Sequence, residues 1–512
     1  MQSSSGKPRS RAWIWIVAIL VVIVLCCCAI TGGGLIYLRS QGQTLQGLLT
    51  DSAQPPLPQE VTVQVMPEAT LPVEPPAPTP IIPTQPSPES AASQLIVAAS
   101  SGMWLFNETS GNLVQVSYDT LETYWEPQAG LSPDRQFFAY ISGFGGASIN
   151  PALMIVNLQD QSIKLRQELT GPFSQPAMDA EICEPAFEAT RAMQFSGSLA
   201  WSPDGQTLAF VGAMEGDTAD VYLYHRADDS ITRLSDEPGH ASDLNWSPDG
   251  RWIEYVSVDC FGTGAGFAMS GLWAAEPQTQ QSVLLEVLDS SGEEFISWAD
   301  EDTFLIRSWG PACEAYNLRA VNVPSTNQQL LVDGCFSGAA YNPAHGDGLL
   351  VVNQFNEEFC SCGDTLKTGL YTYGVDSPLT KVDEFDAYRV DYLPIADLYA
   401  LYGPQGMQAI LTPDGSTLPV RPEVLGFKPY PSPNGQYWAW GSDSSMKSGL
   451  WVTQETASPI SLSPQISGEP VWSQDGQSLY YIEADRVYQA SGPQFRAELI
   501  LEGLGEIQAL IK

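Results

Sequence analysis

The sequence predicts an all-β protein: a single β-propeller of about eight four-stranded blades, preceded by one transmembrane helix and a Pro-rich linker. Three observations lead to this prediction. A strand–turn–strand unit recurs along the chain, an uncharged segment lies near the N-terminus, and prolines crowd the stretch between the two. Short strands that recur every 20–50 residues are typical of propellers, because one hairpin cannot bury both of its faces.

The clearest copies of the unit are WSPDGQTLAFVG, from Trp201, and WSPDGRWIEYVS, from Trp246. In each, Ser-Pro-Asp-Gly is turn chemistry: the proline presets φ, the aspartate accepts backbone hydrogen bonds, and the glycine tolerates a positive φ. The residues that follow are β-branched or aromatic, as in a strand. The residues to which we assign this structural role are Trp201, Pro203, Asp204, Gly205, Trp246, Pro248, Asp249, Gly250, Trp472, Asp475 and Gly476.

Degraded copies begin at Leu131, Trp298, Tyr341, Tyr392 and Pro431. From Trp246 onward the copies start 39 to 52 residues apart, whereas 70 residues separate the starts at positions 131 and 201. Residues 94–116 add three strands that lack a first strand, and residues 505–511 are the candidate to supply it and to close the ring. The tally is nine units; if one is spurious, we expect it to be the copy at Tyr392. Seven to nine blades are compatible with the pattern, and two smaller rings are the alternative to one ring.

The string WSPDGQTLAFVG, followed by DVYLYHRADDSITRLS, resembles the repeat of TolB-type propellers, also called WD40-like or PD40 repeats. The resemblance covers most of residues 94–512, although Leu131 and Pro431 replace the tryptophan in two copies. It implies the fold, but many unrelated functions share this repeat. Similar propellers also precede the hydrolase domain of serine peptidases of the prolyl-oligopeptidase type; no Gly-x-Ser-x-Gly elbow occurs here, so we expect no such hydrolase.

The N-terminal region divides into a short tail (1–11), a predicted transmembrane helix (12–38) and an extracytoplasmic linker (39–93). Residues 12–38 carry no charge, and Lys7, Arg9 and Arg11 precede them, so the positive-inside rule places the tail in the cytoplasm and the propeller outside. A cleaved signal peptide is the alternative. Residues 26–28 are cysteines, which we expect to be packing residues, with lipid attachment as the alternative.

The linker contains 12 prolines in residues 51–93, a composition that favours an extended polyproline II stalk. A docking ligand is the other function of such segments. Beyond it the chain is strongly acidic: the whole sequence has 22 Lys and Arg against 59 Asp and Glu, a net charge of −37. This charge excludes nucleic acid as a partner, which needs a basic surface. We interpret it as a solvated acidic coat, and no motif predicts a calcium loop, another metal site or a cofactor.

Six cysteines lie beyond the predicted membrane helix, and an even number in an exported domain predicts disulfides. The repeat places all six on the face of the disc opposite the Ser-Pro-Asp-Gly turns. Our first pairing is Cys313 with Cys335, among 15 possible connectivities. A zinc site is a weaker alternative, because Cys360 and Cys362 have only one residue between them. The disulfide candidates are Cys183, Cys260, Cys313, Cys335, Cys360 and Cys362.

The same face carries the two longest excursions, residues 171–195 and 257–271, and we expect a partner to bind there. The three histidines form no recognisable catalytic set, and we assign no catalytic residue. The function predicted is a non-catalytic protein- or peptide-binding module at the cell surface. Two alternatives stay open: a hydrolase or lyase that uses carboxylates of the central channel, and a glycan-binding propeller, which would need exposed aromatic residues outside the repeat positions. The oligomeric state is not predicted.

Overall fold

The computed structural model describes residues 94–512 apart from 122–126, 145–148, 172–182, 196, 263–266, 289–291, 311–312, 354–365, 443–446 and 455–456; side chains are not described for 309–316. Contacts divide the chain into two units, Met1–Ile82 and Pro83–Lys512, and all described residues belong to the second. The predicted membrane helix and linker therefore lie outside the described residues. Within the described part of the chain, no helix is long and apolar enough to cross a bilayer.

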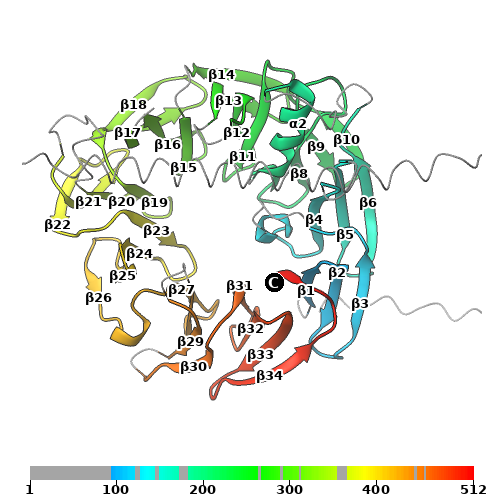
Figure 1. Ribbon diagram of the computed structural model, residues 1–512. Helices are drawn as coiled ribbons and strands as arrows, with labels where there is room; N and C mark the ends of the chain where they lie inside the picture. Colours follow the sequence, from blue (N-terminus) through cyan, green and yellow to red (C-terminus); the bar gives the residue numbers. More distant parts are fainter. Residues whose placement is uncertain are drawn as a thin grey trace, which may run out of the picture. The chain divides into compact units, whose positions relative to one another are not determined.

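Nine antiparallel sheets follow one another around a ring (Figure 1). The first five comprise β1 (Gln94–Ala99), β2 (Gly102–Asn107), β3 (Leu113–Ser117) and β35 (Ile507–Ile511); β4 (Phe137–Ser142), β5 (Ala152–Asn157) and β6 (Ser162–Glu168); β7 (Leu199–Trp201), β8 (Thr207–Gly212), β9 (Asp220–His225) and β10 (Ser230–Arg233); β11 (His240–Trp246), β12 (Ile253–Cys260), β13 (Ala268–Glu276) and β14 (Gln281–Val287); β15 (Gly292–Trp298), β16 (Thr303–Gly310), β17 (Cys313–Asn322) and β18 (Gln328–Cys335).

The other four sheets comprise β19 (Gly338–Asn342), β20 (Asp347–Val352), β21 (Gly369–Gly374) and β22 (Thr380–Asp383); β23 (Arg389–Leu393), β24 (Leu398–Gly403), β25 (Gly406–Leu411) and β26 (Thr417–Leu418); β27 (Lys428–Pro431), β28 (Trp438–Gly441), β29 (Leu450–Thr453) and β30 (Ile460–Ser463); β31 (Ser467–Trp472), β32 (Ser478–Glu483), β33 (Arg486–Ser491) and β34 (Arg496–Leu501). The described helices are the 3₁₀ turns η2 (Pro127–Gly130) and η3 (Pro422–Val424) and the α-helix α2 (Pro185–Gln194). The predicted propeller is confirmed, with nine blades.

The ring closes as the sequence predicts. Strand β35 pairs with β1 in antiparallel register, with Ile511 opposite Ile96, and thereby supplies the inner strand of the first blade. In Figure 1 the C-terminus accordingly lies beside β1. Pairing the last strand with the first removes two sheet edges that would otherwise expose unpaired backbone groups.

Two details of the blade count differ from the sequence prediction. The copy at Tyr392, which we expected to be the spurious one, is a genuine blade, β23–β26; the expectation was wrong. Its strands pair in order and Pro394 keeps the proline of the turn, but Leu393, Ile395 and Ala396 replace the serine, aspartate and glycine and hide the repeat. The blade that begins at Leu131 has three strands, and its inner strand is reduced to a single bridge between Leu131 and Phe138.

The repeated tryptophans link each blade to the one before it. In four inner strands the indole Nε1–H donates to a backbone carbonyl of the preceding blade, so each ring packs in or against the core and also forms an inter-blade hydrogen bond. The donor–acceptor pairs are Trp201 with Gly130 (2.9 Å), Trp246 with Ala200 (2.9 Å), Trp298 with Asn245 (3.3 Å) and Trp472 with Tyr430 (2.9 Å).

The turn motif is a small hydrogen-bond network. The hydroxyl of Ser202 donates to Asp204 (2.6 Å), and the backbone N–H of Gln206 donates to the same carboxylate (2.9 Å). The N–H of Thr207 then donates to Ser202 Oγ (3.0 Å). Gly205 takes φ 66°, which explains why the motif ends in glycine. The same serine-to-acid contact recurs in Ser132–Asp134, Ser247–Asp249 and Ser473–Asp475, and Asn434 replaces the acid beside Ser432.

Candidate functional site

The long connection between β6 and β7 folds into a helix that covers two blades. Helix α2 begins with Pro185, which suits the first helical position because no N–H is needed there. Ala189, Ala192 and Met193 recur at helical spacing and are buried in the core cluster. The helix packs against β8 and β11 and lies beside their blades in Figure 1. The sequence analysis assigned no secondary structure to this excursion and so missed the helix, because its apolar face is narrow and consists mostly of alanine.

A disulfide joins this connection to the next blade. Cys183, just before α2, is bonded to Cys260 at the end of β12, 77 residues later, with Cα atoms 4.9 Å apart. The two excursions that the sequence singled out therefore meet on one face. Cys335 is also disulfide-bonded. The side chain of its predicted partner, Cys313, is not described, and Cys360 and Cys362 lie outside the described residues. The predicted pairing therefore stays a prediction.

A buried carboxylate holds the helix to the same loop. Glu188 is fully buried; one oxygen accepts the backbone N–H of Cys183 (3.2 Å) and the other that of Phe261 (2.7 Å). Arg191 Nη1 lies 3.9 Å from this carboxylate and donates to the carbonyl of Gly262 (3.0 Å). Two backbone donors satisfy the carboxylate where water is absent, so this contact fixes the position of the helix.

Two cysteines and one acid come close together here, which is a common donor set for metals. The ligand atoms of Cys183, Glu188 and Cys260 lie within 4.8 Å of one another. Metals bind thiolates, however, and the two sulfur atoms are bonded to each other. One carboxylate that is already hydrogen-bonded is then the only ligand left, and the group does not fit a metal centre in its disulfide form.

Three phenylalanines form the apolar part of this face. The rings of Phe195 and Phe261 stack with centroids 4.7 Å apart, and Phe267 packs edge-on against both, at 4.9 and 5.2 Å. Phe261 is buried, whereas Phe267 is 36% exposed. Arg191 lies over the ring of Phe195, 5.8 Å from its centroid. We call Arg191, Phe195 and Phe267 the insertion face; it presents aromatic surface and a cation on a backbone held by a disulfide.

Two titratable groups lie near this end of blade β7–β10, and both act structurally. His240 Nδ1 accepts the backbone N–H of Ala219 (3.1 Å), and burial lowers the pKa of His240, so the ring is neutral. Asp220 is buried and accepts from Arg233 (2.7 Å). Burial raises the pKa of Asp220 to about 7, and the guanidinium of Arg233 opposes that rise.

Glu254 on β12 and Asp243 on β11 form a pair of acids of the kind that a carboxylate-dependent enzyme would need. Glu254 is 1% exposed and accepts from Asn245 Nδ2 (2.9 Å). Burial, and then the charge of Asp243, raises the pKa of Glu254 well above its usual value and so favours its protonated form. Its position in the repeat is filled by alanine in other blades, for example Ala209. Because Glu254 is sealed from solvent, it contacts no open surface where a substrate could bind.

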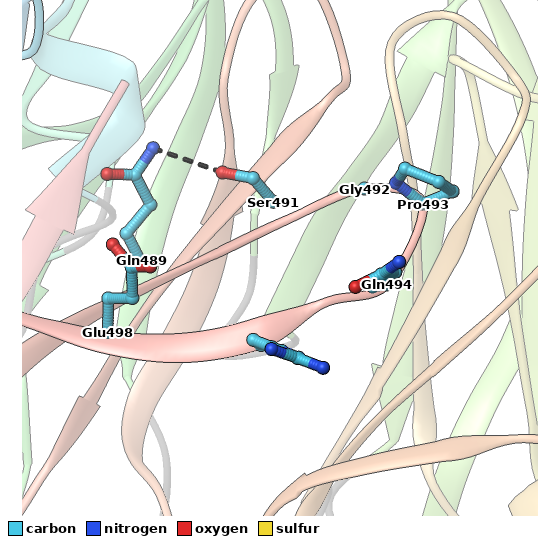
Figure 2. Close-up of a pocket in the computed structure, with 7 residues that line it drawn as sticks. Gln489, Ser491, Gly492, Pro493, Gln494 and Glu498 are labelled. Atoms are coloured by element: carbon cyan, nitrogen blue, oxygen red, sulfur yellow. Dashed lines mark hydrogen bonds between the residues drawn. The ribbon is translucent and has the colours of Figure 1, made fainter.

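Two cavities lie away from the insertion face. One, of about 230 Å³, lies between blades β23–β26 and β27–β30. The other, of about 280 Å³, lies at the β33–β34 turn (Figure 2). The second is polar, and Gln489 Nε2 donates to Ser491 Oγ (3.3 Å) at its edge. Its lining residues are Gln489, Ser491, Gly492, Pro493, Gln494, Arg496 and Glu498.

Sequence reasoning singled out the two excursions that meet here, but not the residues that hold them together. The excursions 171–195 and 257–271 contain Glu188, Phe195, Phe261 and Phe267, yet nothing in the sequence sets these residues apart from other acids and aromatics. Phe195 and Phe261 lie 66 positions apart, and the packing of helix α2 against the neighbouring blades brings them together.

Comparisons with known proteins support the fold alone. No family model matches the chain. A segment of 53 residues is 45% identical to part of the uncharacterized peptidase YuxL of Bacillus subtilis (strain 168); it covers 10% of this chain and 8% of that protein. The chain thus matches only a small part of the length of this relative.

Among solved structures, a eukaryotic initiation factor matches with a TM-score of 0.52 and 11% identity, covering 82% of this chain and 98% of the other. Dipeptidyl peptidase 4 of Porphyromonas gingivalis matches with a TM-score of 0.44 and 12% identity, over 75% and 59% of the two chains. TolB from Acinetobacter baumannii matches with a TM-score of 0.28 and 13% identity, over 73% and 82%. The match with a TM-score above 0.5 supports the fold alone, and at 11% identity it carries no information on the activity of this chain.

Proposed function

We propose that this chain is a membrane-anchored, extracytoplasmic β-propeller that binds a protein or peptide at the insertion face and catalyses no reaction. The observation that carries the proposal is the aromatic surface of Phe195 and Phe267 beside Arg191. Arg191 lies on helix α2, which ends just before Phe195 and is tied to the loop after β12 by Cys183–Cys260 and by Glu188. Aromatic residues and arginine dominate the energetics of protein interfaces. A backbone fixed in advance lowers the ordering cost of binding.

The test compares one exposed apolar side chain on each face of the disc. Phe267→Ser removes the most exposed ring of the insertion face, while Ile395→Ser changes a side chain that is 58% exposed in the β23–β24 turn on the opposite face. The purified full-length chain captures proteins from solubilised envelopes, and the affinity of each captured protein is then measured after purification. We expect Phe267→Ser to weaken the affinity for a true partner at least tenfold and Ile395→Ser to leave that affinity unchanged. Equal effects of the two variants would argue against the proposal.

The anchor is tested separately. We expect the intact chain to stay with membranes after alkaline carbonate extraction, and a variant without residues 12–38 to be released. Protease added to intact cells should cut the propeller region. Protection of the propeller in intact cells, together with its digestion after lysis, would place it on the cytoplasmic side.

The hydrolase or lyase alternative depends on Glu254 and Asp243. Because Glu254 is sealed, this alternative requires an opening of blade β11–β14 that exposes the acid. Turnover of an oligosaccharide or peptide by the wild type, abolished in Glu254→Gln, would favour it.

A further inference from the structure

The connections on the side of the insertion face are acidic even for this chain. Eight acidic residues and one basic residue fall in the four connections that serve blades β7–β10 and β11–β14 on this side, residues 169–198, 213–219, 234–239 and 261–267. The two strand residues on either side of each connection add Glu168, Asp220, Asp259 and one base, Arg233. The totals are eleven acidic and two basic residues, whereas residues 94–512 as a whole contain 54 and 18.

One buried ring shows that acids from different connections come near one another. His240 begins β11, and burial lowers the pKa of its imidazole. The carboxylates that oppose this change are those of Glu188, Asp259 and Asp217. Glu188 is the acid that accepts the N–H of Phe261 and thereby holds helix α2 (2.7 Å). Asp217 and Asp259 are therefore close to the structure that supports the insertion face.

The exposed acids on this side are not neutralised by the protein itself. Among the described residues, Glu215, Asp217 and Asp259 are exposed and form no ion pair. Both arginines on this side already pair with other acids, at 3.9 and 2.7 Å. We call Glu215, Asp217 and Asp259 the acidic rim; its charge is open to a partner.

The acidic rim begins beside the exposed aromatic ring. Cys260 on β12 is paired with Ala268 on β13, and Asp259 and Phe267 are the residues just before them on the two strands. Phe267 is 36% exposed, and Asp259 is exposed as well. A side chain that covers the ring of Phe267 therefore brings its own neighbours in the partner close to a carboxylate.

The spacing of the acids favours several separate cations over one metal ion. A metal ion draws its ligand atoms to within about 5 Å of one another. In the part of the chain that the structure describes, the acids, histidines and cysteines that meet this condition in a group of three are Cys183, Glu188 and Cys260, whose sulfur atoms are bonded to each other. The acidic rim is more widely spaced, which suits positive charges carried at intervals along a polypeptide.

We propose that the partner of the insertion face presents a basic polypeptide segment in which lysine or arginine flanks an apolar side chain. The apolar side chain packs against Phe267, and the cations pair with Asp217 and Asp259 on the acidic rim. Complementary charge excludes wrong partners and speeds association, and salt screens both effects. This inference rests on the proposed function, because it specifies the partner of the same face.

The experiment titrates the full-length chain in detergent with labelled peptides and follows fluorescence anisotropy. The probe is acetyl-Gly-Lys-Lys-Phe-Lys-Lys-Gly amide. One control peptide has serine in place of the phenylalanine, and the other has glutamate in place of each lysine. We expect saturable binding of the probe, about tenfold weaker binding of the serine peptide and no binding of the glutamate peptide. Added salt should weaken the binding of the probe.

Two double variants with the same change in net charge locate the binding. Asp217→Asn with Asp259→Asn removes two charges of the acidic rim. Glu301→Gln with Asp376→Asn removes two exposed charges from the β15–β16 and β21–β22 turns on the opposite face. We expect the rim variant to weaken binding of the probe about tenfold and the control variant to change it less than about twofold. Circular dichroism checks that both variants keep the fold.

The outcomes separate this inference from the proposed function. If Phe267→Ser weakens binding of the envelope partner and the rim variant does not, the insertion face stands as a binding site and the basic partner is overturned. If the rim and control variants weaken binding of the probe equally, the acidic surface as a whole attracts the peptide and the inference fails. No saturable binding of the probe, or equal binding of the glutamate peptide, would also overturn it. Unchanged binding in both Phe267→Ser and the rim variant would contradict both proposals.

Discussion

The Cys183–Cys260 disulfide closes a loop across two blades, and its removal should lower the thermal stability measurably. The cross-linked positions are 77 residues apart. For a loop of that length, the chain-entropy relation assigns about 4.5 kcal/mol of stabilisation at 25 °C. Unfolding entropy is about 2.1 cal/mol/K per residue, which gives roughly 0.9 kcal/mol/K for residues 94–512. Cys183→Ser should therefore lower Tm by about 5 °C.

The assay is differential scanning calorimetry of the full-length wild type, the two single serine variants and the double variant. Either substitution breaks the same bond, so each single variant and the double variant should melt at the same temperature. Incubation of the wild type with a reductant should reproduce that temperature unless a second disulfide is also cut. A decrease in Tm of less than about 1 °C in all three variants would refute the reasoning, because the bond would then constrain nothing in the unfolded chain.

Three further predictions test the core and the turns. The pKa of Glu254 is raised by burial, so the unfolded state releases this proton before the folded state does as pH rises above about 4.5. The wild type should therefore lose stability with rising pH relative to Glu254→Gln, by at most about 1.4 kcal/mol per pH unit, which urea denaturation at pH 5 to 7 measures. Asp204→Ala should cost about 1 kcal/mol through two lost hydrogen bonds, whereas Asp204→Asn should cost under about 0.5 kcal/mol, because Asn434 fills the same role; chemical denaturation decides. Trp201→Phe should cost about 1–3 kcal/mol, since the carbonyl of Gly130 loses its indole donor, and a cost no larger than that of Asp204→Asn would contradict this.

The parts of the fold that local chemistry controls were predictable. The Ser-Pro-Asp-Gly string specifies a turn through contacts between residues at most five positions apart, as in Ser202 with Thr207. The recurrence of that turn predicts the blades, and the need to pair the first strand predicts the closing role of β35. The blade at Tyr392 was misjudged because Leu393, Ile395 and Ala396 replace the polar turn residues, while the strands around the turn still pair.

The candidate site was predictable only as a face. Counting strands places the cysteines and the long excursions opposite the turns, but it does not say which cysteine lies within reach of which. Helix α2 was missed because tertiary contacts with β8 and β11 stabilise it, and its own amphipathic pattern is weak.

The sequence by itself determined that a hairpin unit repeats, that the ring closes with its last strand, and that the described region is strongly acidic. These properties depend on neighbours in the chain and on composition. Only the tertiary structure decided that Cys183 meets Cys260 and that Glu188 accepts the N–H of Phe261. Such contacts join residues from different blades, and their distances depend on how the blades pack around the ring.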